Sequence, residues 1–182
     1  MKPNGLKNKT RENHKIDGLS PDANKLRGHS KIINVETLTK NIDLAWETTG
    51  TPAEFRSKLL VLFRTTLSEG SNFIQDRFLL NNDGAEAVLA QAYLMDSLIK
   101  AALETVDTKL YRAPNPTRGE QLCIIAVGGY GRGELAPFSD IDLLFLLPYK
   151  QTPRVEQVVE TILYPVSYTH LTLPTKALVE VG

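Results

Sequence analysis

The sequence has a single cysteine, no long apolar run and no excess of charge, and each of these absences excludes a class of protein. One cysteine, Cys123, rules out a disulfide framework and fits a reducing, cytoplasmic setting. No stretch approaches the roughly 20 apolar residues of a membrane-spanning helix, and the N-terminus lacks the apolar core of a signal peptide. A formal net charge of 0 over 182 residues predicts neither a nucleic-acid nor a membrane-surface partner. The sequence is therefore typical of a globular protein, with length for one domain or part of a larger one.

Composition divides the chain into four segments. Residues 1–35 are polar and contain eight Lys and Arg against three Asp and Glu, which predicts a disordered basic arm. Residues 36–112 carry helical periodicity, and residues 113–165 change to apolar, strand-like runs around a glycine cluster. The helical pattern stops at Pro165, and residues 166–182 follow neither pattern. The predicted fold class is α/β, with a helical segment ahead of a partial mixed sheet.

Three helices are predicted in the helical segment. The run Thr51-Pro52-Ala53-Glu54 is a capping box with proline at the first helical position, and Gly70 is expected to end that helix. A second helix is predicted over residues 71–80, stopped by the turn-forming run Asn81-Asn82-Asp83-Gly84. A third, over residues 85–110, has apolar residues at helical spacing, and this face is predicted to pack in a helical core.

Two strands are predicted to flank the glycine cluster. A proline-rich loop is expected over residues 111–120. The runs QLCIIAV (121–127) and IDLLFLL (141–147) are predicted to be buried strands because they are almost continuously apolar. Thr152-Pro153 then predicts the start of another helix.

Asp140 and Asp142 are the candidate catalytic and metal-binding residues. Side chains alternate along a strand, so both carboxylates should share one face, with Cα atoms roughly 6.5–7 Å apart and Ile141 opposite. Two like charges this close are costly without a cation, and two such carboxylates can hold divalent ions. Oxygen ligands without a nearby histidine favour Mg²⁺ or Mn²⁺.

The glycine loop before them is a candidate phosphate-binding site. Gly128 and Gly129 follow the first strand directly and expose backbone N–H groups without side chains. Arg132 adds a fixed positive charge, and Ser139 can offer a hydroxyl or cap the turn before Asp140. A polyphosphate site beside a metal site is what nucleotidyl transfer needs.

Other interpretations explain less of the motif. No Gly-Lys-Ser/Thr follows the glycines, so the loop is not a Walker loop. Gly131, Gly133 and Ala136 match the dinucleotide pattern G-x-G-x-x-A, but Pro137 cuts short the helix that this pattern needs. The Asp-x-Asp motif of a sugar-nucleotide glycosyltransferase leaves the glycines unexplained. A glycine turn beside solvated aspartates would leave both halves without a function.

The string VGGYGRGELAPFSDIDLLFLL resembles the signature of the polymerase-beta-like nucleotidyltransferase superfamily: Gly-Gly, a spacer, then Asp-x-Asp entering an apolar strand. Over residues 36–165 the chain resembles the bacterial bifunctional uridylyltransferase/uridylyl-removing enzymes that act on the PII nitrogen-signalling protein. The resemblance implies transfer of UMP from UTP to a tyrosine of PII, with release of pyrophosphate and use of Mg²⁺ or Mn²⁺. It also implies roles by motif position: metal ligands Asp140 and Asp142, and triphosphate contacts Gly128, Gly129, Arg132 and Ser139.

Parts of that family's architecture are missing from the sequence. The resemblance implies a third carboxylate from a later strand, an HD-type hydrolase domain and glutamine-sensing ACT domains, yet no His-Asp pair occurs. The chain is therefore predicted to be a truncated, inactive part of a uridylyltransferase. The alternatives are an adenylyltransferase of the same superfamily, of the glutamine-synthetase type, and a non-catalytic nucleotide-binding module.

The last segment has an unusual possible origin. Residues Val166 to Thr175 can be encoded by GTC TCT TAT ACA CAT CTG ACG CTG CCG ACG, which looks like a transposase mosaic-end adapter used in sequencing libraries. Residues from about Val166 onward are therefore predicted to be an assembly artefact. A clean genomic DNA sequence through this junction without adapter sequence would contradict that prediction.

Overall fold

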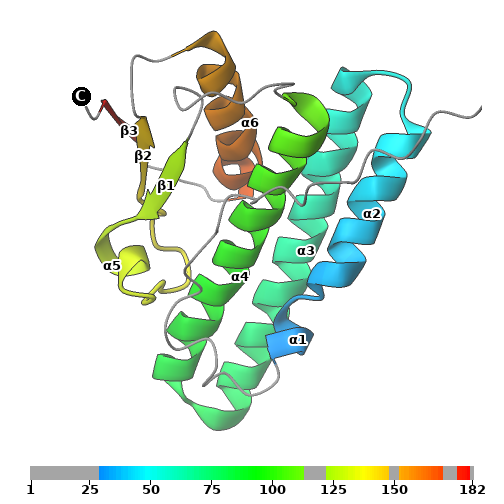
Figure 1. Ribbon diagram of the computed structural model, residues 1–182. Helices are drawn as coiled ribbons and strands as arrows, with labels where there is room; N and C mark the ends of the chain where they lie inside the picture. Colours follow the sequence, from blue (N-terminus) through cyan, green and yellow to red (C-terminus); the bar gives the residue numbers. More distant parts are fainter. Residues whose placement is uncertain (1–28, 113–121, 148–151, 170–175, 181–182) are drawn as a thin grey trace, which may run out of the picture.

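The computed structural model describes residues 29–112, 122–147, 152–169 and 176–180 (Figure 1). The helices are α1 (His29–Ile32), α2 (Val35–Thr48), α3 (Pro52–Asn81), α4 (Gly84–Thr105), the π-helical turn η2 (Val106–Leu110), α5 (Gly128–Gly131) and α6 (Pro153–Thr169). The strands are β1 (Cys123–Ala126), β2 (Leu143–Leu147) and β3 (Lys176–Glu180). Among these helices, none is long and apolar enough to cross a membrane.

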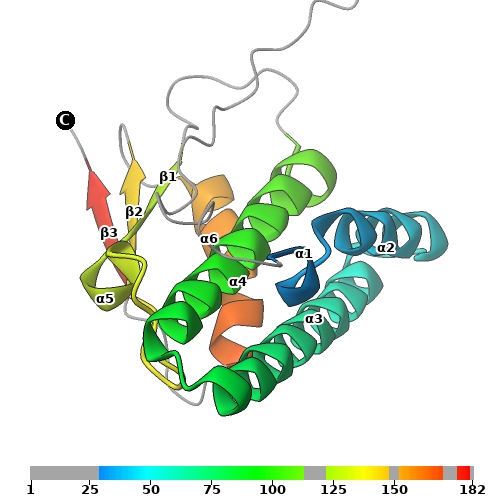
Figure 2. The ribbon, with the colours of Figure 1, turned by 90° about the horizontal axis from the view of Figure 1, so that it is seen from below.

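The fold has a helical layer and a small sheet layer. Helices α2, α3 and α4 lie side by side, and the sheet stands beside α4 with α5 at one end of its strands (Figure 1). The view from below shows α6 between the sheet and the helices α3 and α4 (Figure 2). Buried apolar residues from both layers form one hydrophobic core. The predicted α/β class is confirmed.

The helix starts follow the local sequence signals. The Thr51 hydroxyl accepts a hydrogen bond from the amide of Glu54 at 3.2 Å, and the Glu54 carboxylate accepts one from the Gly50 amide at 3.1 Å. Asp83 caps α4 in the same way, by accepting from the Glu86 amide at 3.0 Å. These side chains satisfy amides that have no partner inside the helix. The predicted capping box is confirmed.

The prediction that Gly70 ends a helix is wrong, because α3 continues from Pro52 to Asn81. A Cβ atom on Gly70 would lie 2.7 Å from both terminal carbons of Leu94 and 2.8 Å from the carbonyl oxygen of Ile32. Glycine is needed here because α1 and α4 approach α3 closely. The helix ends instead at Asn82, which has a left-handed φ of 53° and donates its amide to Phe78 O at 2.7 Å.

The prediction that a disordered arm extends to residue 35 is wrong for its last residues. Ile32 and Ile33 are only 6% and 4% exposed, so residues 29–35 belong to the helical layer. The remaining part of the predicted arm, residues 1–28, lies outside the described residues, as does most of the predicted loop over 111–120.

The sheet is mixed, as predicted, with the strand order β1-β2-β3. Strands β1 and β2 are antiparallel with Cys123 opposite Leu146, and β2 and β3 are parallel with Leu143 opposite Lys176. The prediction of a buried strand over residues 121–127 is wrong for β1, since Cys123 is exposed and Ile125 is 37% exposed. No residue of β1 is buried, whereas the central strand β2 buries every second residue, so β2 supplies the core face of this pair.

The helix predicted to open at Thr152-Pro153 is confirmed, and the Thr152 hydroxyl accepts a hydrogen bond from the Val155 amide at 3.3 Å. This helix, α6, continues to Thr169, past the point at Pro165 where the sequence pattern stops. The segment after Val166 also contributes β3 to the sheet. Regular structure therefore extends further along the chain than the periodicity predicts.

Candidate functional site

The end of β1, the glycine helix α5 and the residues before β2 meet at one end of the strands of the sheet. The Val127 amide donates a hydrogen bond to the carbonyl oxygen of Asp142 at 3.1 Å, which continues the β1–β2 ladder by one step. Gly128 follows with a left-handed φ of +63°. A Cβ atom on Gly128 would lie 2.9 Å from Oδ2 of Asp142, so its bare backbone lies directly against that carboxylate.

Asp140 and Asp142 both precede β2, which begins at Leu143 rather than at the predicted Ile141. The alternation of side chains nevertheless extends back through them. Asp140 is exposed and Asp142 is half-buried, while Ile141 between them is 2% exposed. The burial pattern thus separates the two carboxylates from the apolar face, as the sequence predicts.

These two side chains offer oxygen ligands only, which is the donor chemistry that suits Mg²⁺ or Mn²⁺. The free Cys123 is exposed on β1 and is the sole cysteine of the chain. Within the part of the chain that the structure describes, no group of three or more His, Cys, Asp and Glu side chains could hold a metal ion. The described residues therefore contribute two carboxylates to the candidate site and no third.

Arg132 follows the glycine helix and bonds back to its first residue. Its Nη1 donates to the carbonyl oxygen of Gly128 at 2.9 Å, and its Nε pairs with Glu134 Oε2 at 3.2 Å. Both charged side chains are largely exposed, at 67% and 60%. A Cβ atom on Gly129 would lie 3.0 Å from the Glu134 carbonyl oxygen, so the turn folds closely back on itself. Arg132 thus shapes the glycine turn while its guanidinium remains open to solvent.

Ser139 lies at the end of a tight turn just before Asp140. Its amide donates to the carbonyl oxygen of Ala136 at 3.1 Å. Phe138, within this turn, has a φ of 66° and is 93% exposed. A left-handed conformation is unusual for a bulky residue, and Pro137 before it favours this kind of turn. The turn sets the direction in which the chain enters the two aspartates.

The sequence interpretation missed Tyr130 and Asp96. Tyr130 belongs to α5, is 5% exposed, and donates its hydroxyl to Oδ1 of Asp96 on α4 at 2.7 Å. Burial, and then the neighbouring Asp96 carboxylate, raise the pKa of Tyr130 well above its usual range. The hydroxyl is therefore a permanent donor at ordinary pH. In the sequence, the sign that Tyr130 is buried is that it is the single aromatic residue within the glycine cluster.

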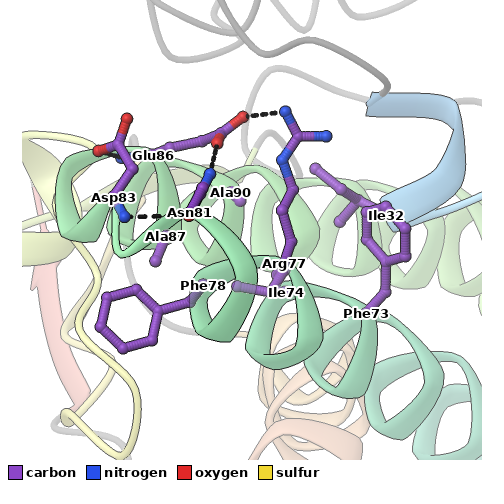
Figure 3. A pocket seen from close by; sticks show the side chains of 10 residues that line it. All are labelled: Ile32, Phe73, Ile74, Arg77, Phe78, Asn81, Asp83, Glu86, Ala87 and Ala90. Atoms are coloured by element: carbon purple, nitrogen blue, oxygen red, sulfur yellow. Dashed lines mark hydrogen bonds and ion pairs between the residues drawn. The ribbon is translucent and has the colours of Figure 1, made fainter.

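A separate pocket lies in the helical layer, between α1, α3 and the start of α4 (Figure 3). In it, Glu86 pairs with Arg77 at 2.6 Å and accepts from Asn81 Nδ2 at 2.8 Å. Apolar residues, among them Ile32 and Phe78, line the rest. None of its lining residues comes from the sheet layer, so this pocket is distinct from the glycine and aspartate site.

Comparison with known proteins supports the same kind of site as the geometry does. Residues 117–167 match the family described as Nucleotidyltransferase domain. The bifunctional uridylyltransferase/uridylyl-removing enzyme of Azospirillum brasilense is 44% identical over 133 residues, which are 73% of this chain and 14% of that protein. The enzyme of the same name from Rhodospirillum rubrum is 41% identical over 77% of this chain and 15% of its own length.

A third relative of that name, from Caulobacter vibrioides, is 44% identical over 66% of this chain and 13% of its own length. The chain thus matches at most 15% of each of these relatives. No solved structure matches the chain. The chain is therefore similar to part of the bifunctional uridylyltransferase/uridylyl-removing enzymes, and its residues 117–167 match the nucleotidyltransferase domain family.

Proposed function

We propose that this site transfers UMP from UTP to a tyrosine hydroxyl of the PII signalling protein and releases pyrophosphate. The observation that supports it best is the contact between the Gly128 backbone and the Asp142 carboxylate. A bare backbone that can approach a triphosphate and a carboxylate that can hold its cation lie at the same point. The names of the relatives support uridylyl transfer in particular.

The chemistry assigns a role to each part of the site. The tyrosine oxygen forms a bond to the α-phosphorus of UTP, the bond from that phosphorus to the α–β bridging oxygen breaks, and the hydroxyl proton leaves. Asp140 and Asp142 would hold Mg²⁺ or Mn²⁺, which supplies charge neutralisation for the triphosphate when bound. A third carboxylate, from outside the described residues, is proposed as the group that receives or directs the proton.

The glycine helix is proposed to hold the triphosphate. The first amides of a helix have no acceptor within it, and Gly128 and Gly129 leave theirs unobstructed by side chains. Arg132 and Ser139 are proposed as further triphosphate contacts. Arg132 bonds the Gly128 carbonyl oxygen, so it lies next to the glycine amides, and its side chain is largely exposed to solvent.

This chain by itself is proposed to be inactive. It matches at most 15% of each relative, and its described residues offer two carboxylates where the chemistry calls for three. The reaction is proposed to take place in the cytoplasm, a setting that fits the exposed free thiol of Cys123 because thiols stay reduced there.

Residues 166–182 are proposed to be encoded by adapter sequence rather than by the parent gene. The match to the nucleotidyltransferase domain ends at residue 167, close to the proposed junction. Genomic DNA sequence across the codon for Val166 tests this, since uninterrupted coding sequence with no adapter would contradict it.

Calorimetry of UTP binding in the presence and absence of Mg²⁺ tests the site. We expect the folded chain to bind UTP only with Mg²⁺, and the variant Asp140→Asn/Asp142→Asn to bind at least tenfold more weakly, because it loses both charged ligands. The matched control is Asp43→Asn/Asp76→Asn, which removes two exposed carboxylates from the helical layer and should bind like the original chain.

Two results would contradict the proposal: equal UTP binding by the Asp140/Asp142 variant, or no nucleotide binding by a chain that circular dichroism shows to be folded. Tighter binding of ATP than of UTP would instead support an adenylyltransferase. Turnover by a longer chain that carries the downstream region, with PII as acceptor, would separate an enzyme from a non-catalytic nucleotide-binding module.

A further inference from the structure

The glycine helix is attached to the helical layer by a polar link that the proposed chemistry does not use. Tyr130 lies in the middle of α5, and its hydroxyl donates to Asp96 on α4 at 2.7 Å. A second link lies close by, where the Leu135 amide donates to the carbonyl oxygen of Val88 on α4 at 3.3 Å. Both links join the segment between β1 and β2 to α4.

The remaining contacts of the glycine helix leave it little freedom. A Cβ atom on Gly131 would lie 2.5 Å from the carbonyl oxygen of Ala126, so one side of α5 is pressed against β1. Gly128, which precedes Tyr130 in the chain, lies against the Asp142 carboxylate. A small rotation of α5 about β1 would therefore move Gly128 relative to Asp142.

The Tyr130 ring lies where it can control that rotation. It is 5% exposed, and its hydroxyl reaches Asp96 across the boundary between the two layers. An apolar ring alone can slide in a core, whereas a hydrogen bond to a carboxylate fixes the direction of the side chain. Asp96 is thus 34 positions away in sequence but linked to the glycine helix through one hydrogen bond.

We propose that Asp96 is a positioning residue for the nucleotide site: through Tyr130 it sets the orientation of Gly128–Gly131 against Asp142. This inference rests on the proposed function for its consequence, since the orientation matters when a triphosphate must meet both the glycine amides and the metal carboxylates. It assigns to the helical layer a part in nucleotide binding, beyond support of the fold.

Amide hydrogen exchange tests the positioning without any nucleotide. Tyr130→Phe removes only the hydroxyl, and we expect the amides of residues 128–134 to exchange about tenfold faster, because the loss of one hydrogen bond to a charged group is of that size. Tyr111→Phe is the matched control, since it removes a hydroxyl that accepts from Arg56 Nη2 at 2.7 Å, away from α5. If residues 128–134 change no more than the β1 amides do, the bond serves overall stability alone and the proposal is overturned.

Calorimetry with UTP and Mg²⁺ then tests the consequence at a temperature where every variant is folded. We expect Tyr130→Phe and Asp96→Ala to bind UTP about tenfold more weakly, and the double variant to bind no more weakly than the weaker single one. Asp96→Asn keeps an oxygen that accepts from Tyr130 and should restore affinity to within about threefold of the original chain. Tyr111→Phe should bind normally.

The possible failures are distinguishable. Equal UTP affinity in Tyr130→Phe and the original chain overturns the positioning role. Absence of UTP binding in the folded original chain counts against the proposed function, and the exchange result for residues 128–134 then decides alone whether Asp96 positions the glycine helix.

Discussion

Glycine is used in both layers of the molecule, but it solves a different problem in each. Gly70 lies inside the continuous helix α3, where a Cβ atom would meet Leu94 and the Ile32 carbonyl. Gly128 begins the glycine helix with a φ of +63° and lies against the Asp142 carboxylate. The first glycine lets helices pack, and the second lets backbone approach charge. Substitutions at these positions should therefore separate stability from ligand binding.

The largest effect is expected for Gly128→Ala. An alanine there would carry about 1–2 kcal/mol of left-handed strain and place its Cβ 2.9 Å from Asp142 Oδ2. We expect Mg²⁺-dependent UTP affinity, measured by calorimetry, to fall at least thirtyfold, because both the glycine amides and the carboxylate must move. A change within twofold would show that the site does not depend on this contact.

Gly70→Ala should have its effect on stability alone. Overpacking typically costs about 1–3 kcal/mol, partly offset by the roughly 0.5–1 kcal/mol that alanine gains over glycine in a helix. Urea unfolding should show a net loss of about 1–2 kcal/mol, while the folded protein keeps its UTP affinity. The exposed neighbour Glu69→Ala is the control and should change stability by less than about 0.5 kcal/mol. Weaker UTP binding by folded Gly70→Ala would break the distinction between the two glycines.

The buried Tyr130, which lies at the boundary between the two layers, predicts a pH dependence of the unfolding free energy. Its pKa is raised in the folded state, so its contribution to stability is complete below the ordinary tyrosine value of 10.0 and is lost as pH rises above it. At pH 10.5 the original chain should have lost on the order of 1 kcal/mol more unfolding free energy than Tyr130→Phe, relative to pH 8. Urea titrations at both pH values measure this difference, and parallel curves would exclude it.

Arg132 is expected to show the smallest effect. Arg132→Ala should weaken UTP binding about threefold, since the Arg132 side chain is 67% exposed and its charge is screened by solvent. Arg132→Lys keeps the charge but not the fork that bonds the Gly128 carbonyl and Glu134. Normal binding by the lysine variant would assign the role to charge, and equal weakening would assign it to the shape of the glycine turn.

Local signals made the helix starts and the alternation of burial around Ile141 predictable. The capping hydrogen bonds of Thr51 and the helix start after Thr152 involve residues three positions apart, so the sequence contains all their parts. The alternation around Ile141 likewise depends only on neighbouring residues. Such features are readable from the chain because short-range geometry determines them.

The features that could not be predicted depend on residues far apart in the chain. Gly70 looks like a helix end until Leu94 and Ile32 are known to pack against it. The runs of β1 and β2 are similarly apolar, but only the pairing order shows that β1 is an edge strand with Cys123 exposed. The link between Tyr130 and Asp96 spans 34 positions and needs the packing of α5 on α4.

The exposed thiol on β1 offers a use unrelated to nucleotide chemistry. Cys123 is the only cysteine in the chain, so a fluorophore or spin label directed at thiols would attach at one defined position. That position lies on the strand that leads into Gly128 and pairs with Leu146 on the strand that follows Asp142. A label there would report on the end of the β1–β2 pair away from the site, while leaving every residue proposed to contact UTP or metal unaltered.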